Sequence, residues 1–271
     1  MSDETGFRSL DGLLLRGSVT HPAGTPRGVA VLVHGGGATR EESGFFRRFA
    51  EGLAGAGIGS LRFDLRGHGE SEGRQEDVTI AGILNDIRAA TDHVRTLMEC
   101  GPVHLIGTSF GGGICAFFAA NRPQEVKSLT LMNPLLNYKK RFIEDKPYWN
   151  SDRIDEHEGA ELAACGFLEH SPTFRLGRAL LNEVFYLEPH RSLGGVESPT
   201  LIIHGTRDTF IPVESSRSAV RSLKGESRLL EIDGAQHGFA VHDDPEYLHP
   251  QTREWQALVI RSVVDWTSAH R

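Results

Sequence analysis

The sequence predicts an α/β fold in which a mostly parallel central sheet is covered by helices on both faces. Short apolar runs, of which residues 28–35 are continuous and β-branched, alternate with segments of helical periodicity. Runs of this kind are typical of strands that are buried on both faces. Strands that alternate with helices imply right-handed crossovers, and therefore parallel neighbours in one sheet.

The expected elements follow in order along the chain. The first strand, residues 28–35 (GVAVLVHG), is continuous, β-branched and closed by glycine. Apolar residues at intervals of three, four or seven predict a long helix that starts near Asp77. Strands are expected over residues 28–35, 58–67, 103–109, 126–134, 198–208 and 227–239. Helices are expected over residues 43–57, from about 77 to 97, 111–123 and 252–270.

This alternation stops between residues 135 and 196. That segment contains no clear strand, several aromatic residues and charges of both signs, and it is too long and too apolar for a plain loop. We therefore expect a mostly helical cap over residues 135–196, inserted into a core formed by residues 1–134 and 197–271. Phe167, Phe174, Phe185 and Tyr186 either line an apolar pocket or join the cap to the core.

Composition and charge exclude several classes of protein. The 271 residues are 39% hydrophobic and 24% charged, which is ordinary for a globular protein. The net charge of −7 and the lack of a long basic run argue against a nucleic-acid partner. The polar, acidic N-terminal stretch and the lack of a long apolar run predict a cytoplasmic protein without a membrane span. The oligomeric state stays open, with a homodimer as one alternative.

The three cysteines and the acidic clusters do not indicate a metal or a cofactor. Cys100, Cys115 and Cys165 are odd in number and unclustered, so they suggest neither a disulfide framework nor a metal site, although one disulfide with a free thiol is an alternative. The run 155–158 (DEHE) lacks the H-E-x-x-H spacing that places two imidazoles on one helical face. We expect no metal and no organic cofactor.

A single serine lies among glycines where a strand is expected to meet a helix. Residues 107–111 (GTSFG) fit the pattern G-x-S-x-G between a strand and a helix. In that context the turn strains the serine backbone, and a side chain on either flanking glycine would clash with neighbouring elements. The bare pattern is weak, because a glycine-rich turn has the same letters, but at this place it predicts Ser109 as a nucleophile.

A hydroxyl needs an imidazole base, and the base needs a carboxylate that orients it. For a serine between a strand and a helix, the expected order along the chain is serine, acid and then histidine. Asp208 follows one expected strand and His237 follows the last, so both lie where ligands bind in open α/β sheets. We predict Asp208 as the acid and His237 as the base.

Acyl transfer also needs N–H donors aimed at the tetrahedral anion. One candidate is the N–H of Phe110, the residue after the nucleophile. The other lies in the glycine loop after the first strand, where bare glycines allow close approach of the backbone. Gly36 is the first choice and Gly35 the second.

These residues resemble the α/β-hydrolase superfamily over nearly the whole chain. The oxyanion loop HGGG and the segment FDLRGHGESEG (residues 63–73) are similar to those of bacterial cinnamoyl or feruloyl esterase-like serine hydrolases. The resemblance implies the α/β-hydrolase fold, a helical cap, and the roles given above to Ser109, Asp208, His237, Gly36 and Phe110. Members of that family commonly carry an aromatic residue at the position of Gly36 and a histidine at the position of Thr108. The acyl pocket of this protein is therefore expected to differ in shape from theirs.

The expected activity is hydrolysis of a small carboxylic ester through an acyl-enzyme on Ser109. A thioesterase or an acyltransferase would use the same chemistry, and a lyase could use the same histidine and aspartate. A binding protein with a relic triad is a further alternative. The polar turn with Asp64, Arg66, His68 and Gly69 is expected to be structural, as is His204.

Overall fold

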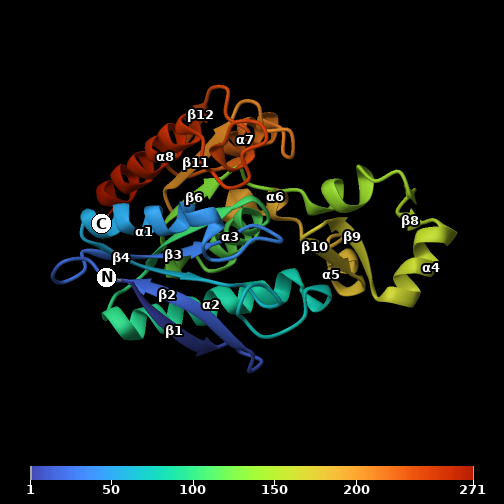
Figure 1. Ribbon diagram of the computed structural model, residues 1–271, viewed down its shortest axis with the longest axis horizontal. Helices are drawn as coiled ribbons and strands as arrows, with labels where there is room; N and C mark the ends of the chain where they lie inside the picture. The colour runs from blue at the N-terminus through green and yellow to red at the C-terminus, as the bar shows by residue number, and fades with distance from the viewer. Residues whose placement is uncertain (1, 271) are drawn as a thin grey trace.

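An eight-stranded sheet forms the centre of the protein (Figure 1). The structure is a computed structural model that describes residues 2–270. The strands are β1 (Ser2–Arg8), β2 (Leu14–Thr20), β3 (Gly28–Val33), β4 (Ile58–Phe63), β5 (Val103–Thr108), β6 (Val126–Met132), β11 (Thr200–Gly205) and β12 (Ser227–Ile232). Their order across the sheet is β1-β2-β4-β3-β5-β6-β11-β12. All neighbours from β4 to β12 are parallel, which confirms the predicted fold class.

Helices cover both faces of the sheet because its strands are apolar on both faces. In β3, Val29, Val31 and Val33 join one core cluster, whereas Ala30 and Leu32 join the other. Alternate residues of a strand point to opposite faces, so a run that is apolar throughout needs a layer on each side. The first cluster includes residues of α2 (Ile80–Met98), α3 (Ser109–Asn121) and α7 (Val213–Ser222); the second includes residues of α1 (Phe45–Gly55) and α8 (Pro250–Ala269).

The long second helix shows how the sequence sets an element's bounds. The Thr79 hydroxyl accepts a hydrogen bond from the Gly82 N–H at 2.9 Å and caps the N-terminus of α2, two residues after the expected start. Ile83, Ile87 and Val94 are buried along one face. The helix ends where Glu99 adopts a left-handed conformation. None of the helices within residues 2–270 is both long and apolar enough to span a bilayer.

The structure contains core elements that the sequence did not predict. Strands β1 and β2 form an antiparallel hairpin, and β2 pairs with the edge of β4. Only Phe7 is buried in β1, so the strand carries too little apolar pattern to be recognised. Helix α7 was missed for the same reason, since its face toward the core consists of Val213, Ser216 and Ala219.

The segment between β6 and β11 leaves the sheet and lies to one side, in yellow and green in Figure 1. We call residues 135–196 the cap segment; its bounds as a separate unit stay a prediction. It contains a π-helical turn (Lys140–Glu144), α4 (Glu156–Cys165), α5 (Arg178–Glu183) and α6 (Pro189–Ser192). It also contains two short hairpins that the sequence did not indicate, β7 (Trp149–Asn150) with β8 (Arg153–Ile154), and β9 (Phe167–Ser171) with β10 (Phe174–Gly177). Strands this short show no readable alternation.

Candidate active site

Ser109 lies at the tight turn between β5 and α3, and its φ of 50° places it in the left-handed region. A non-glycine residue in that region is strained, so the surrounding structure must hold it there. A Cβ at Gly107 would lie 2.6 Å from Cys115 Sγ, and a Cβ at Gly111 would lie 2.4 Å from the His34 carbonyl oxygen. These distances confirm that both flanking positions require glycine.

Asp208 and His237 lie in loops beyond the carboxyl ends of β11 and β12, beside Ser109. His237 Nε2 is 3.0 Å from Ser109 Oγ, and His237 Nδ1 is 2.7 Å from Asp208 Oδ2. Because an ionised carboxylate only accepts hydrogen bonds, Nδ1 carries the proton and Nε2 is free to accept the serine proton. The structure therefore brings together the three side chains that the sequence predicted, in hydrogen-bonding order.

The buried carboxylate of Asp208 is held ionised by its neighbours. Its Oδ1 accepts hydrogen bonds from the backbone N–H groups of Phe210 and Ile211 at 2.8 and 2.9 Å. Burial raises the pKa of Asp208, but hydrogen bonds from His204 and His237 outweigh burial and hold the pKa well below its usual range. Asp208 is thus suited to stabilise a positive charge on His237.

His204 was expected to be structural, and its contacts confirm this. Its Nδ1 lies 2.7 Å from Ser216 Oγ, and its Nε2 lies 2.9 Å from the Ile211 carbonyl oxygen and 3.4 Å from Asp208 Oδ2. The ring therefore fixes the loop that carries Asp208.

The glycine loop after β3 leaves one N–H group without a partner among residues 2–270. The Gly35 N–H donates to Glu42 Oε1 at 3.0 Å, and the Gly37 N–H donates to His68 Nε2 at 3.1 Å. Because the Gly35 N–H is engaged, the second choice for an oxyanion donor is not available. The N–H of Gly36 remains, beside that of Phe110 at the free N-terminus of α3. Gly36, Phe110 and Ser109 line one cavity.

Glu42 is a site residue that the sequence analysis missed. Its carboxylate holds the Gly35 backbone, and a Cβ at Gly35 would lie 3.7 Å from both Glu42 Oε1 and Ser109 Oγ. Burial raises the pKa of Glu42, and the hydrogen bond from the Gly35 N–H offsets part of this rise. An acidic residue a few positions after a glycine loop was the only signal in the sequence, and such residues are too common on surfaces to indicate a role.

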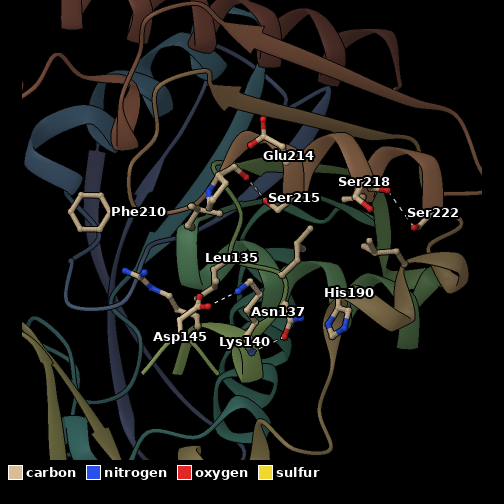
Figure 2. A pocket seen from close by; sticks show the side chains of 16 residues that line it. Leu135, Asn137, Lys140, Asp145, His190, Phe210, Glu214, Ser215, Ser218 and Ser222 are labelled. Atoms are coloured by element: carbon tan, nitrogen blue, oxygen red, sulfur yellow. Dashed lines mark hydrogen bonds and ion pairs between the residues drawn. The ribbon is translucent and has the colours of Figure 1, made fainter. Parts of the chain in front are cut away.

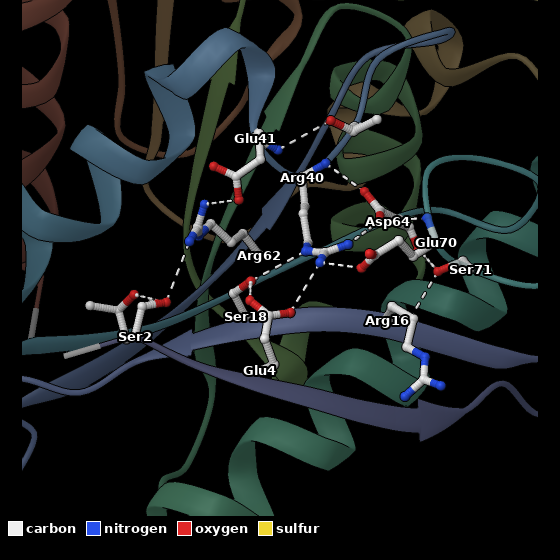
Figure 3. A network of polar contacts seen from close by, with 12 residues as sticks. Ser2, Glu4, Arg16, Ser18, Arg40, Glu41, Arg62, Asp64, Glu70 and Ser71 are labelled. Atoms are coloured by element: carbon white, nitrogen blue, oxygen red, sulfur yellow. Dashed lines mark hydrogen bonds and ion pairs between the residues drawn. The ribbon is translucent and has the colours of Figure 1, made fainter.

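The polar turn after β4 supports the glycine loop, as expected for a structural turn. Figure 3 shows the network of polar contacts around Asp64 and Arg40. Asp64 accepts from the Arg40 N–H at 2.7 Å and from the Glu70 N–H at 3.0 Å, and it pairs with the Arg40 guanidinium. The His68 Nδ1 lies 3.0 Å from the Arg66 carbonyl oxygen, and burial lowers the pKa of His68. Neutral His68 thus donates its Nδ1–H to the Arg66 carbonyl oxygen and accepts, at Nε2, the hydrogen bond from the Gly37 N–H of the glycine loop.

A cavity of about 390 Å³ lies next to Ser109 and His237. The aromatic side chains on its wall include Phe110, Phe142 and Phe174, whose ring centroids are separated by 5.1 to 6.4 Å. Phe174 comes from β10 of the cap segment, so this cavity is lined by both the cap segment and the core.

A second cavity, of about 520 Å³, shares Leu135, Arg141, Phe210 and Ile211 with the first. Figure 2 shows residues of the cap segment on one side of this cavity and residues of α7 on the other. The labelled residues include Leu135, Asn137, Lys140, Asp145 and His190 on the first side and Glu214, Ser215, Ser218 and Ser222 on the second. The two cavities together provide a continuous wall from Ser109 to α7.

Of the four aromatic residues named in the cap segment, Phe174 fits the expectation of a pocket lining, whereas the contacts of Phe185 and Phe167 given below are with other residues of the cap segment. Phe174 lines the cavity beside Ser109. Phe185 packs against Trp149 with centroids 6.1 Å apart, and Phe167 lies under the Arg175 guanidinium. Tyr186 is 84% exposed and does neither.

The other residues considered as metal ligands either have a structural role or do not lie in a cluster. Asp155 caps α4 by accepting from the Glu158 N–H at 2.9 Å. Within the described part of the chain, no group of three or more histidine, cysteine or acidic side chains is arranged to hold a metal ion. The three cysteines, Cys100, Cys115 and Cys165, are all free thiols.

Comparisons with known proteins agree with the geometry. A family model described as serine aminopeptidase, S33, matches residues 24–151. Monoglyceride lipase of Homo sapiens is 33% identical over 286 aligned residues, covering 95% of this chain and 88% of that protein. Monoacylglycerol lipase of Mycolicibacterium smegmatis is 28% identical, covering 98% and 97%. The solved structure of Est1E from Butyrivibrio proteoclasticus with bound ferulic acid has a TM-score of 0.80 at 21% identity, covering 97% and 98%, which shows a shared fold.

Proposed function

The chain belongs to the α/β-hydrolase superfamily and is a carboxylic-ester hydrolase, and from this premise we propose that it cleaves small esters through an acyl-enzyme on Ser109. The observation that carries the proposal is the continuous hydrogen-bonded chain from Ser109 Oγ through His237 to Asp208, with distances of 3.0 and 2.7 Å. Such a chain turns a weakly nucleophilic hydroxyl into one that can attack a carbonyl carbon.

In the proposed mechanism His237 Nε2 takes the Ser109 proton as Oγ bonds to the acyl carbon. The Asp208 carboxylate stabilises the imidazolium that forms, and its low pKa keeps it ionised throughout. His237 then gives the proton to the leaving alcohol oxygen. Water, deprotonated by His237, attacks the acyl-enzyme, and the released proton returns to Ser109 as the acid leaves.

The N–H groups of Gly36 and Phe110 are proposed to bind the oxyanion. The partners of Gly35 and Gly37 support this choice, because they leave Gly36 as the free donor of the loop. A preorganised donor of this kind contributes about 3–4 kcal/mol to transition-state stability.

Two substrate classes are supported by different observations. The relatives with the highest identity quoted above are named as lipases of monoacylglycerols, which favours glycerol esters of single acyl chains. The aromatic wall formed by Phe110, Phe142 and Phe174 favours an aryl acyl group of the cinnamoyl type, because aromatic rings pack well against one another. The cap segment is proposed to select between them by closing the cavity over the acyl group.

The mechanism is tested by labelling the protein with a fluorophosphonate and measuring the hydrolysis of 4-nitrophenyl butyrate. We expect labelling of Ser109 in the native protein, no labelling of Ser109→Ala, and a loss of kcat of at least about 10⁴-fold in that variant. Ser268→Ala, in the remote helix α8, is the matched control and should behave as the native protein.

Turnover that survives in Ser109→Ala would overturn the acyl-enzyme and favour a lyase that uses His237 and Asp208. Paired oxygen esters and thioesters of one acyl group test the leaving group. A large preference for the thioester would replace the esterase assignment by a thioesterase.

A further inference from the structure

Arg141 places a positive charge in the wall of the cavity beside Ser109. It lies in the π-helical turn Lys140–Glu144 at the start of the cap segment, and turns of this kind are frequent at functional sites. Its side chain lines both the cavity of about 390 Å³ and the adjoining cavity of about 520 Å³. Arg141 therefore lies where the two cavities meet.

No carboxylate within residues 2–270 lies within 4 Å of the Arg141 guanidinium, and it makes no hydrogen bond to another described residue. Its neighbour Lys140 differs, because Lys140 pairs with Asp145. A guanidinium presents five N–H donors and cannot lose its charge in a protein. Half-buried beside aromatic rings, this group has donors that a ligand can satisfy.

No carboxylate among the described residues lines the cavity beside Ser109, whereas Asp145 and Glu214 line the adjoining cavity. Among the described residues that line the cavity beside Ser109, Arg141 alone carries a permanent charge. His170 also lines this cavity, and its buried Nδ1 has no hydrogen-bond partner among the residues that the structure describes. Burial, together with the nearby charges of Lys146 and Arg141, lowers the pKa of His170 to about 4. His170 is therefore neutral near pH 7 and can contribute one donor or one acceptor to a ligand.

We propose that the substrate is an ester that carries a carboxylate, which the Arg141 guanidinium binds while Ser109 attacks the ester carbonyl. The inference rests on the proposed acyl-enzyme on Ser109, but it departs from the two neutral substrate classes named above and points to anionic esters, such as half-esters of dicarboxylic acids. Guanidinium and carboxylate match as a planar, two-point pair, and charge-assisted hydrogen bonds are stronger than neutral ones. Arg141 is thus assigned as a specificity-determining residue.

The test compares anionic and neutral esters of matched shape. On the acyl side the pair is 4-nitrophenyl hydrogen glutarate and 4-nitrophenyl pentanoate; on the alcohol side it is 4-acetoxybenzoate and phenyl acetate. We expect Arg141→Gln to lower kcat/KM for at least one anionic ester by about 10- to 100-fold while changing its neutral partner less than about threefold. Arg141→Lys should retain part of the preference, because it keeps the charge but loses the two-point geometry.

Arg153→Gln is the matched control, since Arg153 is an exposed arginine of the cap segment that lies outside both cavities. It should leave the ratio of anionic to neutral turnover unchanged. Equal losses for anionic and neutral esters in Arg141→Gln, or no loss for either, would overturn the inference while leaving the acyl-enzyme intact. Failure of the acyl-enzyme itself would appear separately, as turnover of every ester by Ser109→Ala.

Discussion

The ring of Phe174 packs against the backbone of Gly36 so closely that a Cβ at position 36 would lie 2.8 Å from Phe174 Cε1. Phe174 belongs to β10 of the cap segment, and Gly36 belongs to the loop after β3. A ring from the cap segment therefore occupies the space beside the proposed oxyanion donor.

Gly36→Ala should disturb this contact. The added methyl group forces either the ring or the loop to shift, so we expect the free energy of unfolding to fall by about 1–3 kcal/mol, with a loss of kcat. Urea unfolding and ester hydrolysis measure the two effects. Phe174→Ala in the same chain should recover part of the stability lost through Gly36→Ala. Additive effects in this double-mutant cycle would show that the two positions are not coupled.

Glu42 is expected to act as a positioning residue. In Glu42→Ala the Gly35 N–H loses its acceptor, so the glycine loop should lose its alignment and kcat should fall about tenfold with little change in KM. Glu42→Gln keeps an oxygen acceptor and should retain most of the activity. Glu51→Ala, on the exposed face of α1, is the control. If Glu42→Gln and Glu42→Ala lose activity equally, the carboxylate charge matters more than the hydrogen bond.

Two buried histidines should make the protein less stable in mild acid. Burial and the neighbouring His68 lower the pKa of His34 to about 3, and burial with the charge of Lys127 lowers that of His104 to about 4. The unfolded chain binds these protons near pH 6.5, so their stabilising effect is present above pH 6.5 and is lost as the pH falls. At pH 5 each histidine should lower the free energy of unfolding by about 2 kcal/mol.

Urea unfolding at pH 7.5 and at pH 5 measures this loss. His104→Gln should reduce the difference between the two pH values, because it removes one proton-binding group far from the active site. His157→Gln, in which an exposed ring is replaced, should leave the difference unchanged. An unaltered pH dependence in His104→Gln would contradict the assignment.

The buried pair of Asp64 and Arg40 should be important for stability. The two side chains are 1% and 11% exposed, so Asp64→Ala leaves the guanidinium without its buried partner. We expect this change to lower the free energy of unfolding by about 3–5 kcal/mol. Arg217→Ala breaks the more exposed pair with Glu231 and should lower the free energy of unfolding far less than Asp64→Ala does. Similar losses in the two variants, measured by urea unfolding, would refute this view of the polar turn.

The sequence by itself determined the parallel sheet and the place of the proposed nucleophile. The run in β3, which is apolar throughout, and the mainly apolar run in β5 are local patterns typical of buried parallel strands. The two glycines beside Ser109 belong to an equally local pattern, although the backbone atom that a Cβ at Gly111 would meet belongs to His34, on the loop after β3. Where the local pattern was weak, as in β1 and α7, the prediction failed because pairing with distant elements decides those segments.

Only the tertiary structure decided which groups meet. Ser109 and His237 are 128 residues apart along the chain, and their hydrogen bond exists because parallel strands end at one edge of the sheet. The choice of Gly36 over Gly35 depends on Glu42, and the shape of the cavity depends on Phe174 from the cap segment. These contacts join residues that are far apart along the chain and share no local pattern. Packing and hydrogen bonding across the whole fold decide them, so no short stretch of sequence encodes these contacts.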